Sequence, residues 1–229
     1  MEHTTYDRSF DALRTGFTAA VSHELRTPLA RILALLESAE LPGADVQSLI
    51  DQARAEVENA GALIDEILFL SELESGREVV SLGHTTALPL LQDVAAAEEP
   101  AATRAGVELQ VTGDDTVDVP LRPRMLRMLT VNLTENAIRY AGHGSTFTLS
   151  IERSGDFAVL TAADDGVGVV ESQIPRLFER FYRGDSARSS RGTGLGLAIV
   201  KHLVAAAGGE VEADGGRGRG LRIRCIFPL

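Results

Sequence analysis

Apolar residues recur three and four positions apart over the first third of the chain, which is the spacing of one face of an α-helix. A first segment, from about Ser9 to Ala39, is followed by Leu41-Pro42-Gly43, a strong turn signal. A second segment, from Asp45 to about Glu74, keeps the same period. Because the connection is short, the pattern predicts an antiparallel helical hairpin. The first segment's apolar positions are Phe10, Leu13, Phe17, Ala20, Val21, Ile32, Leu35 and Leu36.

The apolar stripe on this hairpin is too broad for two helices to bury by themselves. A second copy of the hairpin would complete a four-helix bundle, so we expect a homodimer. The alternative is that the stripe packs on the downstream part of the chain. The length over which the periodicity lasts favours the dimer.

The pattern changes after the hairpin. Residues 75–86 lose the period and contain Gly76 and Gly83, which is typical of a linker. From Ala87 onward, helical and strand patterns are interleaved, which predicts a two-layer α/β sandwich. We expect helices at about 88–104, 123–140 and 195–207, and strands at 107–111, 146–152, 158–163, near 210 and at 221–227.

Composition narrows the function classes. The 229 residues carry a formal net charge of −11, the wrong sign for direct nucleic-acid binding. The single cysteine, Cys225, forms neither an intrachain disulfide nor a cysteine metal cluster, as expected in a reducing compartment. It shares a strand face with Leu221, Ile223 and Phe227, so we expect it in the core. No apolar run approaches the length of a membrane span and no signal peptide opens the chain, so we expect this stretch to be soluble.

His23 and Glu24 stand beside each other in the first helix, outside its apolar stripe. A neutral imidazole can take a phosphoryl group at physiological pH, and an adjacent carboxylate can accept the proton that leaves and hold the useful tautomer. His23 is therefore a candidate nucleophile. Pro28 removes one backbone donor, so a kink is expected one turn after His23.

The whole string from Phe17 to Leu29 closely resembles the phosphoacceptor box of the sensor histidine kinases of two-component systems. The resemblance implies a dimeric hairpin that carries His23 and an ATP-binding domain downstream. It also implies a cytoplasmic location, with any membrane segments in a part of the protein that is absent here. Thr27 lies one turn after His23. The resemblance gives it a role in orienting water toward a regulator's phosphoaspartate, and the alternative is a hydrogen bond to the backbone near Pro28.

A second motif lies on the predicted helix 123–140. Asn132 and Asn136 are four residues apart and share a face, where two amide oxygens suit a hydrated Mg²⁺ that bridges nucleotide phosphates. The string from Asn132 to Tyr140 resembles the asparagine box of histidine kinases, which places Arg139 and Tyr140 at the nucleotide as well. Arg139 stands where lysine is usual, which keeps the charge and changes the geometry.

A third motif, Asp164-Asp165-Gly166-Val167-Gly168, directly follows a predicted strand. Its glycines let a ligand approach the backbone, and a carboxylate can accept a hydrogen bond from the exocyclic amine of adenine. In the family resemblance Asp164 has this role, and Gly166 and Gly168 belong to the same site. Asp165 stands where asparagine is common. The alternative is a plain aspartate at a strand-to-turn junction.

A fourth motif, Gly192-Thr193-Gly194-Leu195-Gly196, opens a helix whose first amides can receive phosphate. A dinucleotide-binding fingerprint fails on spacing, because the third glycine would have to stand at Leu197.

The polar stretch 184–191, just before this glycine run, looks like a mobile lid over ATP. Ahead of it, residues 178–183 resemble the family's phenylalanine box. The resemblance makes Phe178 and Phe181 anchors of the lid and makes Arg183 a phosphate contact.

The motifs follow the family's order over nearly the whole chain. The resemblance implies an α+β protein: residues 1–8 as an N-terminal linker, 9–74 as the dimerisation and phosphoacceptor domain, 75–86 as a linker, and 87–229 as an ATP-binding domain of the gyrase and heat-shock chaperone type. The implied function is ATP- and Mg²⁺-dependent autophosphorylation of His23, followed by transfer to an aspartate of a response regulator. Arg122, where an acidic residue is common, and the basic run Gly215–Gly220 depart from the usual pattern.

Three other readings are weaker. A gyrase-type ATPase needs a glutamate four residues before Asn136, and Asn132 at that position cannot accept a proton. A serine/threonine kinase needs a strand lysine, whereas the only lysine, Lys201, lies in the predicted last helix. A dimeric scaffold that binds ATP without turnover is disfavoured because His23, Glu24, Asn136 and Asp164 are all present.

Overall fold

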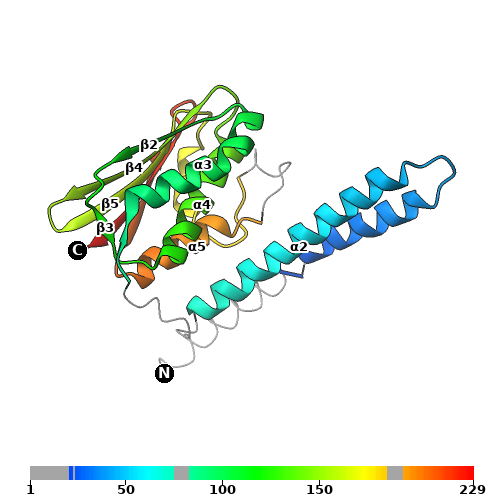
Figure 1. Cartoon of the computed structure of the whole chain (residues 1–229), viewed down its shortest axis with the longest axis horizontal. Helices are drawn as coiled ribbons and strands as arrows, with labels where there is room; N and C mark the ends of the chain where they lie inside the picture. Colours follow the sequence, from blue (N-terminus) through cyan, green and yellow to red (C-terminus); the bar gives the residue numbers. More distant parts are fainter. Residues whose placement is uncertain (1–20, 23, 75–82, 185–192) are drawn as a thin grey trace. The chain divides into compact units, whose positions relative to one another are not determined.

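The computed structural model describes residues 21–22, 24–74, 83–184 and 193–229, and the chain divides into two compact units, Met1–Phe69 and Leu70–Leu229. In Figure 1 the first unit is a pair of long helices, and the second is a β-sheet with helices packed on it. Among the described residues, no helix combines the length and the apolar character needed to cross a membrane.

The first unit is an antiparallel helical hairpin. Residues 21–22 and 24–39 are helical, a turn follows at 40–43, and α2 runs over Val46–Glu74. Gly43 has φ +81° in the turn, a conformation that glycine adopts without steric cost. Asp45 caps α2, because its Oδ1 accepts a hydrogen bond from the N–H of Ser48 at 3.2 Å. Arg31 and Glu56 form an ion pair across the hairpin, Nη1 to Oε1 3.5 Å, so the two helices lie side by side.

The apolar side chains of the hairpin fall into two groups. Leu63 is buried, and Leu49, Ala53 and Ala60 are half-buried. A second group, the exposed apolar row, consists of large side chains that are 43 to 61% exposed: Leu29, Leu33, Leu36, Val46, Ile50, Val57, Ile64 and Leu68.

The second unit is built on a five-stranded sheet with the order β2-β4-β5-β7-β6. The strands are β2 (Glu108–Gly113), β4 (Thr146–Ser154), β5 (Phe157–Asp164), β6 (Glu210–Gly215) and β7 (Leu221–Pro228). β2 pairs with β4 in parallel, and the other pairs are antiparallel. Alternate residues of β4 and β7 are buried, so one face of the sheet is apolar.

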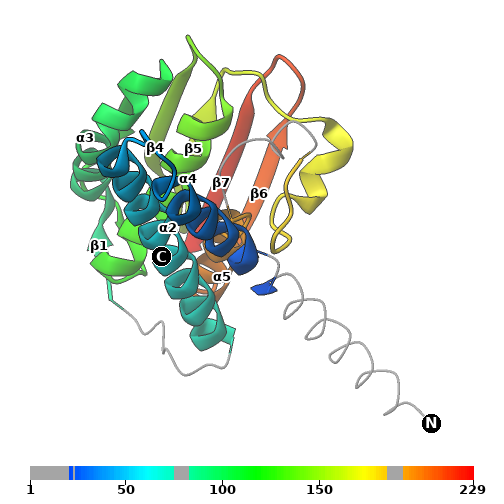
Figure 2. The same cartoon turned by 90° about the vertical axis from the view of Figure 1, so that its right-hand side faces the viewer.

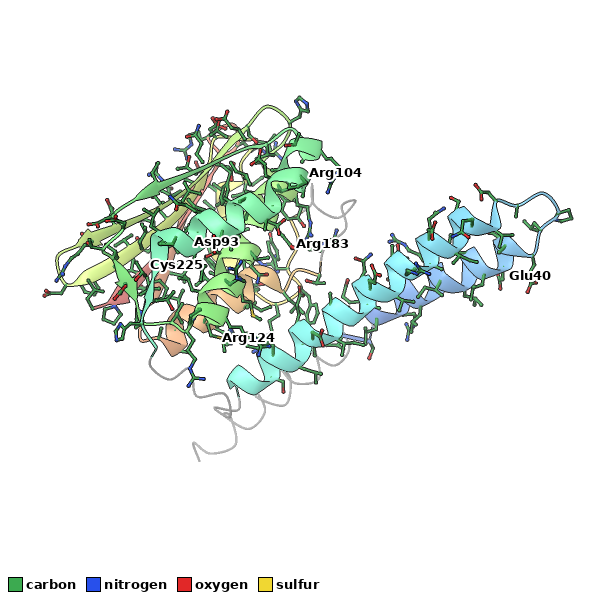
Figure 3. The ribbon with its side chains drawn as sticks, viewed as in Figure 1. Glu40, Asp93, Arg104, Arg124, Arg183 and Cys225 are labelled. Carbon is green, nitrogen blue, oxygen red and sulfur yellow. The ribbon has the colours of Figure 1, made fainter. Side chains whose placement is uncertain are left out.

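Three helices cover that apolar face: α3 (Ala87–Ala105), α4 (Pro123–Tyr140) and α5 (Gly196–Ala206). Figures 1 and 2 show them on one side of the sheet. Pro123 begins α4 where its missing N–H costs nothing. The core between the layers includes Leu91, Leu126, Leu129, Leu133, Leu149, Ile151, Leu160, Ile199 and Phe227. Cys225 of β7, labelled in Figure 3, is fully buried there, as predicted.

The predicted order, a helical hairpin followed by a layered α/β domain, is confirmed. Two expectations need correction. Thr85–Thr86, which we placed in the linker, form strand β1 and pair with β3 (Asp118–Val119) in the second unit. Part of the region after β5 that we expected to be irregular is a 3-10 helix, η1 (Glu171–Arg176). Residues 9–20 of the first predicted helix and 75–82 of the linker lie outside the described residues.

Candidate functional site

The asparagine motif lies on α4, and both of its asparagines are half-buried. The side-chain N–H of Asn132 donates to the carbonyl of Met128 at 2.9 Å, which fixes the orientation of the amide. Its Oδ1 then faces the start of α5: a Cβ added to Gly196 would lie 2.6 Å from that oxygen. The structure thus brings the glycine run against the asparagine motif.

The end of α4 carries the two other residues of this motif. The guanidinium of Arg139 pairs with Glu135 one turn earlier, at 3.6 Å, and both side chains are partly exposed. Such a pair is weak in water, so Arg139 can exchange Glu135 for a phosphate at little cost. Tyr140 is half-buried at the last position of the helix.

Asp164 is the last residue of β5, and its carboxylate is held in place locally. The Oδ1 atom accepts a hydrogen bond from the N–H of Gly166 at 3.0 Å. Burial raises the pKa of the Asp164 carboxyl above its ordinary value. Asp165 acts in the same direction, and the N–H groups of Gly166 and Leu221 act against it. A partly buried carboxylate of this kind is a strong hydrogen-bond acceptor.

The loop after Asp164 is joined to the end of α4. The N–H of Val167 donates to the carbonyl of Ala141 at 2.8 Å, and a Cβ on Gly166 would overlap the same carbonyl oxygen. Only glycine fits at position 166 for this reason. The asparagine motif and the Asp164 motif therefore meet at the C-terminus of α4.

Asp165 has a structural contact that sequence reasoning did not foresee. Its Oδ1 accepts a hydrogen bond from the backbone N–H of Thr146, at the start of the neighbouring strand β4, at 2.6 Å. Asparagine, which is common at this position in the resemblance, offers the same oxygen.

The phenylalanine motif and the glycine run meet at a backbone hydrogen bond. The N–H of Phe181 donates to the carbonyl of Gly194 at 2.9 Å, and the two residues have φ +58° and +70°. A side chain on Gly194 would crowd the backbone of Phe181, since its Cβ would lie 2.8 Å from the Phe181 carbonyl carbon. This bond joins the segments that precede and follow the predicted lid. Residues 185–191 of the lid and Gly192 of the glycine run lie outside the described residues.

Most of the described side chains of these two motifs are largely covered by protein. Phe178, Phe181 and Arg183 follow η1 in the sequence and are half-buried, and Arg183 is labelled in Figure 3. The Thr193 hydroxyl oxygen accepts a hydrogen bond from the N–H of Leu195 at 3.2 Å. Leu195 is fully buried, and α5 begins at the next residue. The N-terminus of α5 can receive an anion at this point.

The side chains present at this site determine which metal ion could bind there. Among the described residues, no group of three or more histidine, cysteine, aspartate and glutamate side chains could hold an ion. Amide oxygens from Asn132 and Asn136, with phosphate oxygens from a nucleotide, fit Mg²⁺, which prefers few protein oxygens and keeps its waters.

The phosphoacceptor helix belongs to the first unit. His23 lies outside the described residues, so its side chain has no described position. Glu24 is half-buried and Thr27 is exposed, both on helical backbone. Pro28 is also on helical backbone, and the helix continues beyond it to residue 39.

Two family models match separate parts of the chain, in the order predicted from the motifs. Residues 13–76 match the His Kinase A (phospho-acceptor) domain. Residues 122–229 match the histidine kinase-, DNA gyrase B-, and HSP90-like ATPase.

Curated relatives and solved structures extend the similarity. The sensor-like histidine kinase SenX3 of Mycobacterium tuberculosis is 32% identical over 224 residues, which cover 95% of this chain and 54% of the relative. The chain thus spans about half the length of this relative. The histidine kinase AdeS of Acinetobacter baumannii has a similar fold, with a TM-score of 0.76 and 22% identity over 90% of this chain and 98% of AdeS.

Two further structures contain a bound molecule. Full-length ShkA in complex with AMPPNP matches with a TM-score of 0.70 and 27% identity over 92% of this chain and 45% of ShkA. The histidine kinase ThkA in complex with the response regulator TrrA matches with a TM-score of 0.74 and 18% identity over 100% of this chain and 67% of that chain. The matched domains and these relatives together show that the chain comprises the catalytic core of a sensor histidine kinase.

Proposed function

We propose that the chain is an ATP-dependent protein-histidine kinase of a two-component system. ATP binds in the second unit, among Asn132, Asp164 and Gly196. The observation that supports this proposal is the convergence of three motifs that are far apart in the sequence. The amide oxygen of Asn132 faces Gly196, and the loop after Asp164 is bonded to the end of α4.

The reaction is a transfer of the γ-phosphoryl group to the imidazole of His23. A ring nitrogen forms a bond to the γ-phosphorus, the bond from that phosphorus to the β–γ bridging oxygen breaks, and ADP leaves. Glu24 accepts the proton that the imidazole gives up. The phosphoryl group then passes from His23 to the carboxylate of an aspartate on a response regulator.

Each part of the nucleotide has protein groups to meet it. Asp164 accepts a hydrogen bond from the exocyclic amine of adenine. Asn132 and Asn136 hold Mg²⁺, which neutralises phosphate charge when it is bound. Arg139 and Arg183 contact phosphates, and Phe178 and Phe181 anchor the lid. The remaining members of the site are Tyr140, Gly166, Gly168, Gly192, Thr193, Gly194, Leu195 and Gly196.

The same proposal includes an assembly. Two hairpins pair through the exposed apolar row, and the receiver domain of a response regulator docks near His23. A response regulator as partner is supported by ThkA, a protein of the same fold that was solved in complex with the response regulator TrrA. The site faces the cytoplasm in a longer, membrane-bound sensor.

Hydrolysis of the gyrase type is the main rival among enzymatic functions. It needs a carboxylate to activate water at the position of Asn132, and the Asn132 amide is already committed as a donor to Met128. Transfer to a protein nucleophile is favoured for this reason.

Labelled ATP with Mg²⁺ tests the proposal. We expect an acid-labile, base-stable phosphoprotein that disappears in His23→Gln. His84→Gln is a matched control, because His84 is exposed and belongs to the second unit, and this variant should label like the original chain. Label that persists on His23→Gln would rule out His23 as the acceptor.

Thr27 has a proposed role in the reverse direction. Thr27 is an exposed residue, and its hydroxyl can orient a water toward the phosphoaspartate of a docked regulator, which would clear phosphate without return through His23. We expect Thr27→Ala to autophosphorylate normally and to dephosphorylate the regulator about tenfold more slowly or worse. Equal clearance of a pre-phosphorylated regulator by both proteins would leave Thr27 with a structural role only.

A further inference from the structure

The turn between β6 and β7 has no role in the site described so far. This turn, residues 215–220, reads Gly-Gly-Arg-Gly-Arg-Gly and connects two antiparallel strands at the edge of the sheet. It lies against residues 164–168, the loop that begins with the base-recognition carboxylate. We call residues 215–220 the glycine turn.

Two backbone hydrogen bonds join the glycine turn to that loop. The N–H of Gly218 donates to the carbonyl of Val167 at 2.9 Å, and the N–H of Gly220 donates to the carbonyl of Gly166 at 3.1 Å. On its other side the loop is bonded to Ala141 at the end of α4. The backbone of the loop is therefore held from both sides.

The contact is too close for side chains at two positions. A Cβ on Gly220 would overlap the carbonyl oxygen of Asp164, and a Cβ on Gly168 would overlap the carbonyl oxygen of Gly216. Gly220 has φ +71°, so it would also be strained with any other residue. The glycine turn thus packs directly on the main chain of the residue that carries the carboxylate.

An ion pair extends the same contact to η1. The Arg219 guanidinium donates through Nη2 to the carbonyl of Gly215 at 3.1 Å and to Oε1 of Glu171 at 2.9 Å. Both side chains are mostly exposed, so this pair adds little to the stability of the fold. Its effect is to tie the turn to the segment that follows the loop.

We infer that the glycine turn is a positioning element for base recognition, which fixes the main chain of Asp164 so that its carboxylate meets the exocyclic amine of adenine. The inference rests on the proposed function. Hydrogen bonds weaken steeply as distance and angle depart from their best values. A base without the amine also leaves a partly buried acceptor without a donor. The glycine turn should therefore set the preference for adenine over other purines.

The test compares ATP with inosine triphosphate, which has a carbonyl oxygen in place of the amine. Calorimetric titration gives the ratio of the two dissociation constants for each variant. Gly220→Ala places a methyl group on Asp164, whereas Gly155→Ala is a matched control with a similar φ, +62°, open space around its Cβ and a place in the turn between β4 and β5. We expect the selectivity ratio to fall roughly tenfold in Gly220→Ala and to stay unchanged in Gly155→Ala.

A second pair of variants covers the case in which Gly220→Ala does not fold. Arg219 and Glu171 lie on the surface, so Arg219→Gln and Glu171→Gln should both fold. Each variant breaks the ion pair and should lower the selectivity ratio by about twofold to fivefold. The double variant should lose no more than either single one, because both break the same ion pair.

The outcomes separate this inference from the proposed function. Asp164→Asn should itself lower the selectivity ratio. If it does and neither Gly220→Ala nor the Arg219 and Glu171 variants do, the glycine turn has no positioning role. Equal losses for both nucleotides in these variants would likewise overturn the inference, since they would show a general defect. An Asp164→Asn variant with unchanged selectivity would remove both the proposed adenine contact and the inference.

Discussion

At the end of β5, the Asp164 carboxylate accepts a hydrogen bond from Gly166 and is partly withdrawn from water. Burial raises its pKa, so the folded chain prefers the protonated form more than the unfolded chain does. The stability that Asp164 contributes is therefore present below the ordinary aspartate pKa. It is lost as the pH rises through the raised pKa of the folded state. At neutral pH the charge that adenine recognition needs is a cost to the fold.

Replacement of Asp164 by asparagine tests this conflict. Without nucleotide, Asp164→Asn should melt at a higher temperature than the original chain at neutral pH, and the difference should shrink as the pH falls into the acid range. Its affinity for ATP should be weaker by on the order of 1 to 3 kcal/mol, because the amide can turn a donor toward the adenine amine. Thermal melts across pH and calorimetric titration measure the two effects.

Asp156→Asn is the matched control for these melts, since Asp156 is exposed in the turn between β4 and β5. It should melt with the original chain throughout. If Asp164→Asn gains no thermal stability at neutral pH, burial of the Asp164 charge carries no cost. If its ATP affinity is unchanged, the carboxylate does not contact the base.

Among the elements, α4 is the one that sequence periodicity predicts best. Its expected bounds, 123–140, are those observed, because Pro123 marks the first turn and buried residues recur at helical spacing. The same periodicity places Asn132 and Asn136 on one side and Leu129 and Leu133 in the core. A long amphipathic helix contains all the information needed to locate it.

Contacts between distant segments could not be read in this way. Strands β1 and β3 have two residues each, too few for any alternation to appear. The order β2-β4-β5-β7-β6 depends on which strands meet in space, and one chain's pattern of apolar residues does not encode that. The contact of Gly220 with Asp164 is of the same kind. In the sequence, this contact is visible only as a run of glycines, which does not show what the glycines pack against.

In the hairpin, the spacing of apolar residues predicts where the buried side of α2 lies but not every residue that is buried there. The spacing of Leu49, Ala53, Ala60 and Leu63 predicts an apolar seam along α2, and Glu56 falls in that seam. Glu56 is only 5% exposed and pairs with Arg31 of the other helix. A buried charge in a helical seam fixes the alignment of the two helices at some cost in stability. Its partner could be identified only in the folded hairpin.

At the scale of the molecule, the proposed reaction divides its parts between two units. The second unit contains the groups that meet the nucleotide, and the first contains His23 and its neighbours Glu24 and Thr27. Catalysis by positioning requires the γ-phosphorus to reach the imidazole nitrogen. An intact nucleotide site is therefore not sufficient for activity, and a variant can bind ATP fully and still fail to label itself.

The exposed apolar row predicts how two chains associate. Full burial of such a side chain from water is worth about 1.5 to 3 kcal/mol, and these side chains are already about half covered, so each adds roughly half of that. Summed over the row, this gain is comparable to the roughly 4 to 15 kcal/mol that association costs. Within the row, Ile50, Val57 and Ile64 recur every seven residues along α2, the repeat of a helical bundle seam. A charge at Val57, in the middle of this repeat, would be buried without a partner between two paired hairpins.

We therefore expect the chain to be a dimer and Val57→Glu to be a monomer at micromolar concentration, with half the mass by light scattering or sedimentation. Phe157→Glu is the matched control, because Phe157 is a large apolar residue of the second unit that is 47% exposed, and this variant should remain a dimer. Both variants should bind ATP as the original chain does, since neither residue belongs to the nucleotide site. A dimer that survives Val57→Glu and also Ile64→Glu would show that the row is covered by something other than a second hairpin.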